Sequence, residues 1–325
     1  MGVVLFALGG TISMAGHDAG EVRRLSGRDV VASAGGRDGG VEVEVRDFAA
    51  IPSAGLTFAD ILDVVEDADQ AVASGAAGIV LTQGTDTLEE TAFLVDTVWT
   101  HDVPFVVTGA MRNPTLPGAD GPANVLAAVQ VASNEAARAQ GALVVFNDEI
   151  HAARQVRKAH AVSTATFVSP DLGAIGRVVE GFPRFLARLP RRGTTTGFSR
   201  ADLAATRVAL YTATLDDDGG QLDLIADTHQ GLVVAGFGAG HVQAALAPAI
   251  GKLAAAMPVV LTSRTGAGPV LESTYGAVGS ERDLLERGLI GGGFVHPYKA
   301  RVLLRLLVAS GTSREDIAAT FAALG

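Results

Sequence analysis

The sequence predicts an α/β protein with two domains. The larger N-terminal domain is expected to have a mostly parallel sheet flanked by helices, with a hairpin extension, and the smaller C-terminal domain a parallel sheet. Short Val-rich runs bounded by Gly alternate with longer segments of helical period, which is the pattern of βα units. The chain has 325 residues, whereas a single hydrophobic core stops growing at roughly 250–300 residues. Hydrophobic residues make up 48% of the chain and charged residues 18%, which is typical of domains with a large core.

The N-terminal domain is predicted to comprise residues 1–187. Its expected strands are residues 3–8, 41–47, 77–82, 104–108 and 142–146. Apolar side chains recur at helical spacing from Phe58 to Ala68, and residues 121–138 form another expected helix. Short alternating runs with Gly and Pro between residues 163 and 186 indicate hairpins that close this domain.

The polar segment at residues 188–206 is predicted to be a linker, and residues 207–325 form the predicted C-terminal domain. Three more parallel strands are expected in “RVALYTAT”, “GLVVAGFGAG” and “PVVLTS”. Helices are expected near residues 242–256 and at 298–309 and 313–323, the last with an N-cap in “TSRED”.

Charge and composition exclude several classes of function. The formal net charge of -10 argues against a general attraction to nucleic acid or anionic lipid, because both depend on clustered Lys and Arg. The chain has no cysteine, which excludes disulfides, thiolate nucleophiles and iron–sulfur clusters. The seven histidines are scattered without an HExxH motif, so we expect no metal and no other cofactor.

The sequence predicts neither a membrane span nor a secretory leader. No window approaches the roughly 18 uncharged apolar residues that a membrane helix requires. The first residues, “MGVVLFALGGTIS”, lack the charged region and the cleavage site of a signal peptide and are predicted to be a strand. We therefore expect a cytoplasmic protein.

Two predicted strands end in glycine-rich loops. “LFALGGTIS” places Gly10 and Thr11 at the carboxyl end of a strand, where ligands bind in open α/β sheets. A purely structural turn is the alternative for this loop. “GFGAG” at residues 236–240 has a similar position, but it lacks the GxGxxG spacing and a suitable acidic residue downstream, so no nucleotide site is expected there.

The stretch “LTQGTDTLEETAFLVD”, residues 81–96, runs from a strand end into a helix whose buried face is fixed by apolar residues at helical spacing. These residues are Leu88, Ala92, Val95 and Trp99. Thr85, Asp86 and Thr87 fall at the first turn, and either Asp86 with Glu89 or Thr87 with Glu90 can form a capping box. One cap needs only one such side chain, so three polar residues here also indicate a site.

Two further segments can reach the same edge of the sheet. “VTGAMRNPTLPGADGPANV” is a strand end followed by a polar loop that carries Ala110. “FNDEIHAARQVRKAHAVSTATF” carries Lys158, for which a solvated surface lysine is the simpler interpretation. We expect the loops with Thr11, Thr85 and Ala110 to converge on one cleft.

Taken together, these motifs resemble the bacterial-type L-asparaginase and glutaminase family. “LGGTIS” at 8–13 and “QGTDTLEETA” at 83–92 are similar to the two signatures of that family. The similarity continues through “TGAMR”, “ADGPANV”, “VVFND”, “TATF”, “VVAGFGAGHV” and “PYKARVLL”, and so covers nearly the whole chain.

The resemblance implies hydrolysis of the side-chain amide of L-asparagine to L-aspartate and ammonia through an acyl-threonine ester, without a cofactor. Thr11 is then the primary nucleophile, and a second constellation holds the remaining catalytic residues, Thr85, Asp86 and Lys158. Ser53 is expected to hold the α-carboxylate of the substrate and Asp86 its α-ammonium group. The other expected substrate-binding residues are Gly10, Gly84 and Ala110.

The proton transfers are not settled by the residues themselves. A threonine hydroxyl is a weak nucleophile that needs an adjacent base, and a lysine can serve only in its neutral form. The neighbouring Asp86 carboxylate favours charged Lys158, so which threonine attacks and which group takes the proton both stay open. Backbone N–H groups at Thr85 or Ala110 are candidates for the oxyanion site.

The sequence departs from the family at several positions. Relatives usually carry a tyrosine on the lid after the first signature, but the first tyrosine here is Tyr211. Ala54 stands where many relatives have a glutamine that contacts the substrate. Glu272 is a candidate for the family glutamate that a neighbouring subunit donates, since the resemblance implies a homotetramer built as a dimer of dimers.

Two other functions are weighed against asparaginase activity. A non-catalytic protein that binds or senses asparagine or aspartate could keep the pocket and lack the lid tyrosine. The amide-hydrolysing subunit of a tRNA amidotransferase is similar in its core, but it normally adds an N-terminal domain before the first signature, and the acidic charge of this chain offers little to tRNA. A minor glutaminase activity is expected, because one methylene is discriminated by only about 1–3 kcal/mol.

Overall fold

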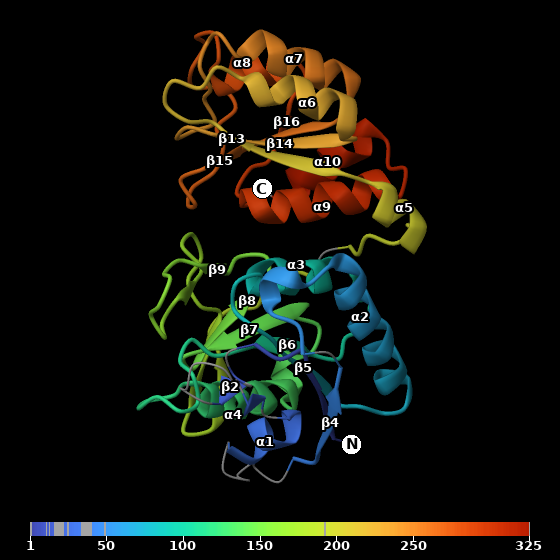
Figure 1. Ribbon diagram of the computed structural model, residues 1–325, viewed down its shortest axis with the longest axis vertical. Helices are drawn as coiled ribbons and strands as arrows, with labels where there is room; N and C mark the ends of the chain where they lie inside the picture. Colours follow the sequence, from blue (N-terminus) through green and yellow to red (C-terminus); the bar gives the residue numbers. More distant parts are fainter. Residues whose placement is uncertain are drawn as a thin grey trace. The chain divides into compact units, whose positions relative to one another are not determined.

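The computed structural model describes residues 2–10, 12, 14–15, 23–24, 26–33, 41–48, 50–191 and 193–324 (Figure 1). The chain divides into two compact units, Met1–Thr194 and Thr195–Gly325, here called the N-terminal unit and the C-terminal unit. Each has its own sheet and its own hydrophobic core, so each is described by itself. The predicted α/β class is confirmed in both.

An eight-stranded sheet forms the centre of the N-terminal unit, in the order β12-β11-β8-β7-β6-β5-β1-β4. Its strands are β1 (Val3–Ala7), β4 (Val43–Asp47), β5 (Gly78–Thr82), β6 (Phe105–Thr108), β7 (Ala142–Phe146), β8 (Glu149–Ala152), β11 (Gly176–Val179) and β12 (Phe182–Phe185). The strands from β4 to β7 pair in parallel, whereas β8, β11 and β12 are added antiparallel. The expected strands are thus confirmed, with ends that shift by up to two residues.

Strand β8 was not expected from the sequence. It follows β7 through a tight turn at Asn147 and Asp148, which both adopt positive φ angles, 53° and 60°. Asn and Asp tolerate this left-handed region better than most residues do. The turn reverses the chain and begins the antiparallel edge of the sheet, which β11 and β12 complete as the predicted hairpin.

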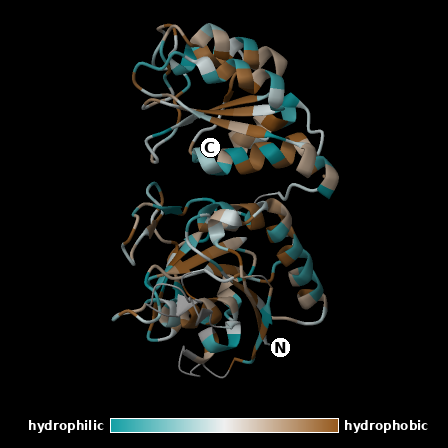
Figure 2. Ribbon diagram, in the orientation of Figure 1, coloured by the Kyte–Doolittle hydropathy of each residue, from teal (hydrophilic) through white to brown (hydrophobic). Residues whose placement is uncertain are grey.

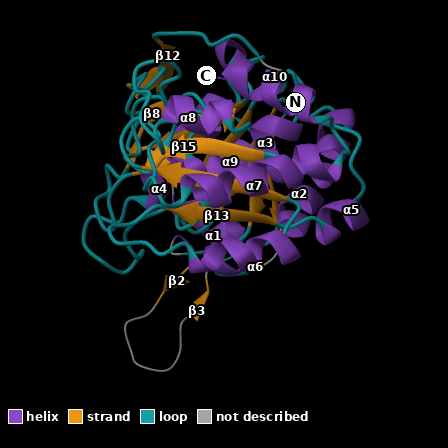
Figure 3. Ribbon diagram, turned by 90° about the horizontal axis from the view of Figure 1, so that it is seen from above, coloured by secondary structure: helices purple, strands orange, loops and turns teal. Residues whose placement is uncertain are grey.

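Helices cover both faces of this sheet (Figure 1). They are α1 (Gly27–Ser33), α2 (Phe58–Ala73), α3 (Leu88–Val98) and α4 (Gly121–Ala132), with short 3₁₀ turns η2 (Ser53–Gly55) and η3 (Glu135–Ala137). The helix expected at residues 121–138 ends at Ala132, because Asn134 is extended and caps the separate 3₁₀ turn through its side chain. Two small antiparallel pairs lie outside the main sheet: β2 (Met14–Ala15) with β3 (Arg23–Arg24), which Figure 3 shows, and β9 (Arg157–Lys158) with β10 (Phe167–Val168).

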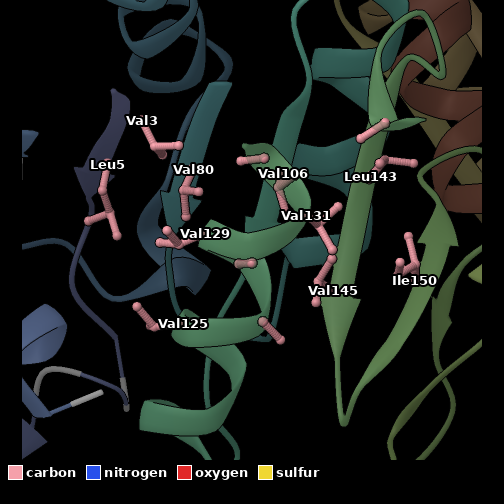
Figure 4. Close-up of a cluster of buried hydrophobic side chains, with 14 of the residues drawn as sticks. Val3, Leu5, Val80, Val106, Val125, Val129, Val131, Leu143, Val145 and Ile150 are labelled. Carbon is pink, nitrogen blue, oxygen red and sulfur yellow. The ribbon is translucent and has the colours of Figure 1, made fainter. Parts of the chain in front are cut away.

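One face of the sheet packs against α4. Figure 4 shows strand side chains such as Val80 and Val106 beside Val125 and Val129 of the helix, and all four are at most 3% exposed. The strands are also the most hydrophobic elements in Figure 2. Full burial of an aliphatic side chain of this size stabilises a fold by about 1.5–3 kcal/mol. This core therefore holds the carboxyl ends of β1, β5 and β6 in a rigid frame.

The C-terminal unit has a four-stranded parallel sheet in the order β13-β14-β15-β16. The strands are β13 (Val208–Thr212), β14 (Gly231–Gly236), β15 (Val259–Ser263) and β16 (Ile290–Gly291). The helices are α5 (Arg200–Ala205), α6 (Gly220–Thr228), α7 (Ala247–Ala256), α8 (Glu281–Glu286), α9 (Pro297–Ala309) and α10 (Arg314–Leu324). The three expected parallel strands are confirmed, and the expected N-cap of the last helix forms, since the Ser313 hydroxyl accepts the Asp316 N–H at 3.1 Å.

The stretch predicted as a linker contains the short helix α5. Arg305 of α9 donates to the carbonyl of Leu203 in α5 at 2.9 Å, so this helix packs within the C-terminal unit. We keep the division into residues 1–187, 188–206 and 207–325 as a proposal. Among the residues that the structure describes, no helix combines the length and apolar character that a bilayer crossing needs.

Candidate active site

The loop from β5 into α3 carries most of the polar side chains at the carboxyl edge of the N-terminal sheet. Thr85 is only 6% exposed, and Gln83 before it is fully buried. Thr87 is the N-cap residue of α3, but it makes no side-chain capping bond; its hydroxyl donates to the carbonyl of Ser53 at 2.9 Å. The expected capping box is therefore wrong. The side chains of Asp86 and Thr87 instead form contacts with residues outside the helix.

Ser53 fixes the position of Asp86. The Ser53 hydroxyl accepts the backbone N–H of Asp86 at 3.2 Å and lies 3.3 Å from the carboxylate oxygen Oδ2 of Asp86. Ser53 is 2% exposed, whereas the Asp86 side chain is 66% exposed. A Cβ on Gly84 would lie 2.6 Å from Ser53 Oγ, so glycine is needed at 84 for this approach. The carboxylate thus stands at a fixed place and faces solvent.

The end of β1 packs tightly against the same loop. Gly10 has a φ of 91°, and a Cβ there would lie 2.3 Å from the backbone nitrogen of Gly84. Only glycine adopts this conformation without strain and leaves room for a second backbone. The predicted nucleophile, Thr11, lies outside the described residues. Its neighbours along the chain, Gly10 and the buried Ile12, are nevertheless held at the carboxyl end of β1.

Lys158 reaches the loop from the small β9–β10 pair. Its ammonium nitrogen Nζ donates to Thr85 Oγ1 at 2.9 Å and lies 3.2 Å from Asp86 Oδ1. The Lys158 side chain is 18% exposed, so most of it is shielded from water while the carboxylate is not. The structure thus brings Lys158 within hydrogen-bond distance of both Thr85 and Asp86, although 73 residues separate Thr85 from Lys158 in sequence. A solvated surface lysine does not describe this side chain.

The third loop, which carries Ala110, is held by two residues that were not singled out from the sequence. The Asp120 carboxylate accepts the backbone N–H groups of Met111 at 3.0 Å and Arg112 at 2.8 Å. The buried Asn124 donates to the carbonyl of Gly109 at 3.0 Å. The segment “ADGPANV” contained the signal, since an acid and an amide stand at positions i and i+4 of one helix start.

This loop also approaches the one after β5. A Cβ on Gly109 would lie 2.5 Å from the carbonyl oxygen of Gln83, and Ala110 is 1% exposed. The convergence expected for the loops after β5 and β6 is therefore present. Ala54 is exposed and offers no polar side chain beside Ser53.

Two residues singled out from the sequence belong to the C-terminal unit. Glu272 is exposed there. The Tyr211 hydroxyl donates to the Asp217 carboxylate, and burial together with this hydrogen bond raises the pKa of the phenol. Among the described residues, no group of three or more His, Asp or Glu side chains could hold a metal ion.

A sheet whose central strands are parallel thus carries a threonine, a lysine and an aspartate together at its carboxyl edge, which is where ligands bind in open α/β sheets. Residues 2–191 match the model of the N-terminal asparaginase domain, and residues 207–321 match that of the glutaminase/asparaginase C-terminal domain. The chain belongs to the asparaginase family.

Known asparaginases are similar in sequence to this chain over most of its length. The chain is 36% identical to a probable L-asparaginase of Deinococcus radiodurans, over 87% of this chain and 86% of the relative. It is 30% identical to a glutaminase-asparaginase of Acinetobacter glutaminasificans over 97% of both chains. The crystal structure of a probable cytoplasmic L-asparaginase from Campylobacter jejuni superposes with a TM-score of 0.88, at 28% identity over 99% of both chains.

Proposed function

We propose that this member of the asparaginase family hydrolyses the side-chain amide of L-asparagine to L-aspartate and ammonia through an acyl-threonine ester. Both family domains are present, so the chain is an asparaginase, an amidohydrolase. The observation that carries the mechanistic part is the contact of Lys158 Nζ with Thr85 Oγ1 at 2.9 Å, at the carboxyl edge of the sheet.

In the proposed reaction, the hydroxyl oxygen of Thr11 attacks the amide carbon and forms a C–O bond. The C–N bond breaks, and the nitrogen leaves as ammonia after it takes up a proton. Water then attacks the ester carbon, which releases aspartate and restores the threonine hydroxyl. Lys158 and Thr85 supply the proton path: Lys158 accepts the hydroxyl proton of Thr11 through the Thr85 hydroxyl, and the same path delivers it to the leaving nitrogen. In the second half of the reaction the path takes a proton from the attacking water and returns it to the Thr11 oxygen.

Substrate recognition is assigned to Ser53 and Asp86. The α-ammonium group of asparagine pairs with the Asp86 carboxylate, which is 66% exposed and faces solvent. The α-carboxylate of asparagine accepts a hydrogen bond from the Ser53 hydroxyl. Gly10 and Gly84 contribute to the site through their backbones, because the absence of a side chain at each lets the loop after β1, the loop after β5 and Ser53 approach one another closely. The backbone N–H groups of Ala110 and Thr85 are the proposed oxyanion donors.

A minor activity on L-glutamine belongs to the same proposal. One extra methylene is discriminated by only about 1–3 kcal/mol in a pocket. A relative that is 30% identical to this chain is named a glutaminase-asparaginase. A comparison of L-asparagine, D-asparagine, L-glutamine and small asparaginyl peptides would rank the substrates directly.

We further propose a cytoplasmic homo-oligomer, assembled as a dimer of dimers, that binds neither nucleic acid nor membrane. The net charge of -10 supports the last two statements. The similarity to a protein described as a probable cytoplasmic L-asparaginase supports the location. Light scattering of the purified protein measures the assembly state, and a monomer that retains full activity would overturn a role for Glu272 of a neighbouring subunit.

Ammonia release by the purified protein tests the main proposal. With millimolar L-asparagine we expect steady ammonia production that stops when the substrate is consumed. The competing function is a protein that binds asparagine without cleaving it. That protein would release no ammonia, while asparagine would still raise its melting temperature through binding to the folded state.

A further inference from the structure

Glu89 has a role in this structure that its position in the helix does not explain. It lies in the first turn of α3, where an acidic side chain usually interacts with the free N–H groups of its own helix. Its carboxylate oxygen Oε2 instead accepts the backbone N–H of Lys158 at 2.8 Å. Glu89 is 6% exposed, so this charge-assisted bond is shielded from water.

The backbone of Lys158 needs such a partner. In the β9–β10 pair, Lys158 stands opposite Phe167, and the neighbouring Ala159 N–H donates to the carbonyl of Thr166 at 2.8 Å. Because alternate N–H groups of a strand point to opposite sides, the Lys158 N–H points away from β10. It meets the Glu89 carboxylate there. The β9–β10 pair is separate from the eight-stranded sheet, so main-sheet hydrogen bonds do not place Lys158.

Thr85 and Glu89 belong to one short segment, four residues apart, where the loop enters α3. This segment therefore holds Lys158 at two atoms: Thr85 accepts from Nζ at 2.9 Å, and Glu89 accepts from the backbone nitrogen at 2.8 Å. A long, flexible side chain reaches one place reproducibly only when its backbone is also fixed. Without the second contact, Nζ loses its fixed distance to the Thr85 hydroxyl.

We propose that Glu89 is a positioning residue, which sets the distance between Lys158 Nζ and Thr85 Oγ1 by holding the backbone of Lys158. The inference rests on the proton-transfer role proposed for Lys158. Glu89 does not touch the substrate. Its removal should therefore lower kcat and leave KM for asparagine within about twofold, because proton transfer depends steeply on the distance between the groups.

The same helix offers a matched control. Asp96 of α3 accepts the backbone N–H of Ala142 at 2.8 Å, which is the same kind of bond at the same length. Ala142 is the first residue of β7, at the amino end of the strand and therefore at the edge of the sheet opposite the site. Asp96→Ala should lower the melting temperature about as much as Glu89→Ala does and leave kcat within about twofold.

The experiment measures kcat, KM, melting temperature and amide hydrogen exchange for four full-length variants, Glu89→Ala, Glu89→Gln, Glu89→Asp and Asp96→Ala. A displacement of about 1 Å can cost about 100-fold in rate, so we expect kcat of Glu89→Ala to fall by that order. Glu89→Gln keeps a carbonyl oxygen that can accept the N–H and should recover most of the rate. Glu89→Asp shortens the side chain by one methylene and should behave like Glu89→Ala, which preserves the test if the alanine variant does not fold.

Exchange of the Lys158 amide should accelerate in Glu89→Ala and stay unchanged in Asp96→Ala. Lys158→Met, measured in parallel, distinguishes a failure of the positioning role of Glu89 from a failure of the proton-transfer role of Lys158. Full kcat in Glu89→Ala with a strong loss in Lys158→Met would overturn the role of Glu89 alone. Full kcat in Lys158→Met would overturn the proposed mechanism instead. A glutamine variant as slow as the alanine variant would also overturn the positioning role, since the hydrogen bond would then not be what matters.

Discussion

The carboxyl ends of the parallel strands in the two sheets carry similar residues, and the two units use them differently. In the C-terminal unit, Ser263 donates to the carbonyl of Gly238 at 2.5 Å, and Arg264 donates to the carbonyl of Ala213 at 2.8 Å. The Arg264 guanidinium also lies 4.3 Å from the ring centre of Phe237. These polar groups hold their own loops together.

At the corresponding edge of the N-terminal unit, side chains contact side chains. Lys158 donates to the Thr85 hydroxyl, and Ser53 and Lys158 both contact the Asp86 carboxylate, which remains largely exposed. Glycine-rich loops after parallel strands occur in both units, so this pattern alone does not indicate a site. The difference is that Ser263 and Arg264 donate to backbone carbonyls, whereas Lys158 joins the side chains of Thr85 and Asp86, and the Asp86 carboxylate faces solvent.

The largest effect is expected from the threonines. Thr85→Ala removes the acceptor of Lys158 Nζ, and Thr11→Ala removes the proposed nucleophile, so each should lower kcat by roughly a thousandfold or more. The fold should survive, because neither change creates a large cavity. Ammonia release and circular dichroism check both statements. The matched change in the other unit, Ser263→Ala, should leave kcat unaltered, and wild-type rates in either threonine variant would contradict the assignment.

Lys158→Met keeps the length of the side chain and removes the ionisable group. We expect kcat to fall by about 100-fold or more, because general acid–base groups typically contribute that much, while KM changes little. The pH–rate profile of the variant should differ from that of the wild-type enzyme, because the proposed proton carrier has been removed. An unaltered pH–rate profile in Lys158→Met would remove the lysine from the proton path.

Gly84→Ala should weaken substrate binding. The added Cβ would come within 2.6 Å of Ser53 Oγ, so Ser53 must move away from Asp86. Overpacking of this kind costs about 1–3 kcal/mol, and we expect it to appear as a higher KM and a lower melting temperature. Gly193→Ala is the control, because a Cβ there has no neighbour within 4 Å. Equal KM values in the two variants would show that the close approach at Gly84 has no role in binding.

The smallest effect concerns the acid stability of the C-terminal unit. The hydrogen bond from Tyr211 lowers the pKa of the Asp217 carboxyl below its ordinary value of 3.8. The folded state then binds this proton less readily than the unfolded state, so the contribution to stability is present above pH 3.8 and is lost as the pH falls below it.

Asp217→Asn should therefore flatten the fall of the melting temperature below about pH 4, with kcat unchanged. Melting curves of both proteins from pH 7 to pH 3 measure the difference. If the substitution lowers kcat instead, the Asp217 carboxylate contributes to activity as well as to the structure of its loop. The distinction between a catalytic edge in the N-terminal unit and a structural edge in the C-terminal unit would then be wrong.

The sequence by itself determined the two sheets, the helix from Leu88 and the placement of Thr85, Asp86 and Ala110 at strand ends. Apolar periodicity reports which face of an element is buried, and this signal is local. The family resemblance grouped Lys158 with Thr85 and Asp86 and assigned Ser53 to the α-carboxylate of the substrate, which neither periodicity nor spacing could do.

Only the tertiary structure decided which polar groups meet. Locally, Thr87 and Glu89 looked like helix caps, yet Thr87 contacts Ser53 and Glu89 contacts Lys158, which is 69 residues away. Asp120 and Asn124 likewise act on a loop that the pattern of the helix does not reveal. A polar side chain bonds with whichever donor the packed core brings near, because leaving a buried donor without a partner costs about 1–3 kcal/mol. Packing between distant segments sets that choice, and no local pattern contains it.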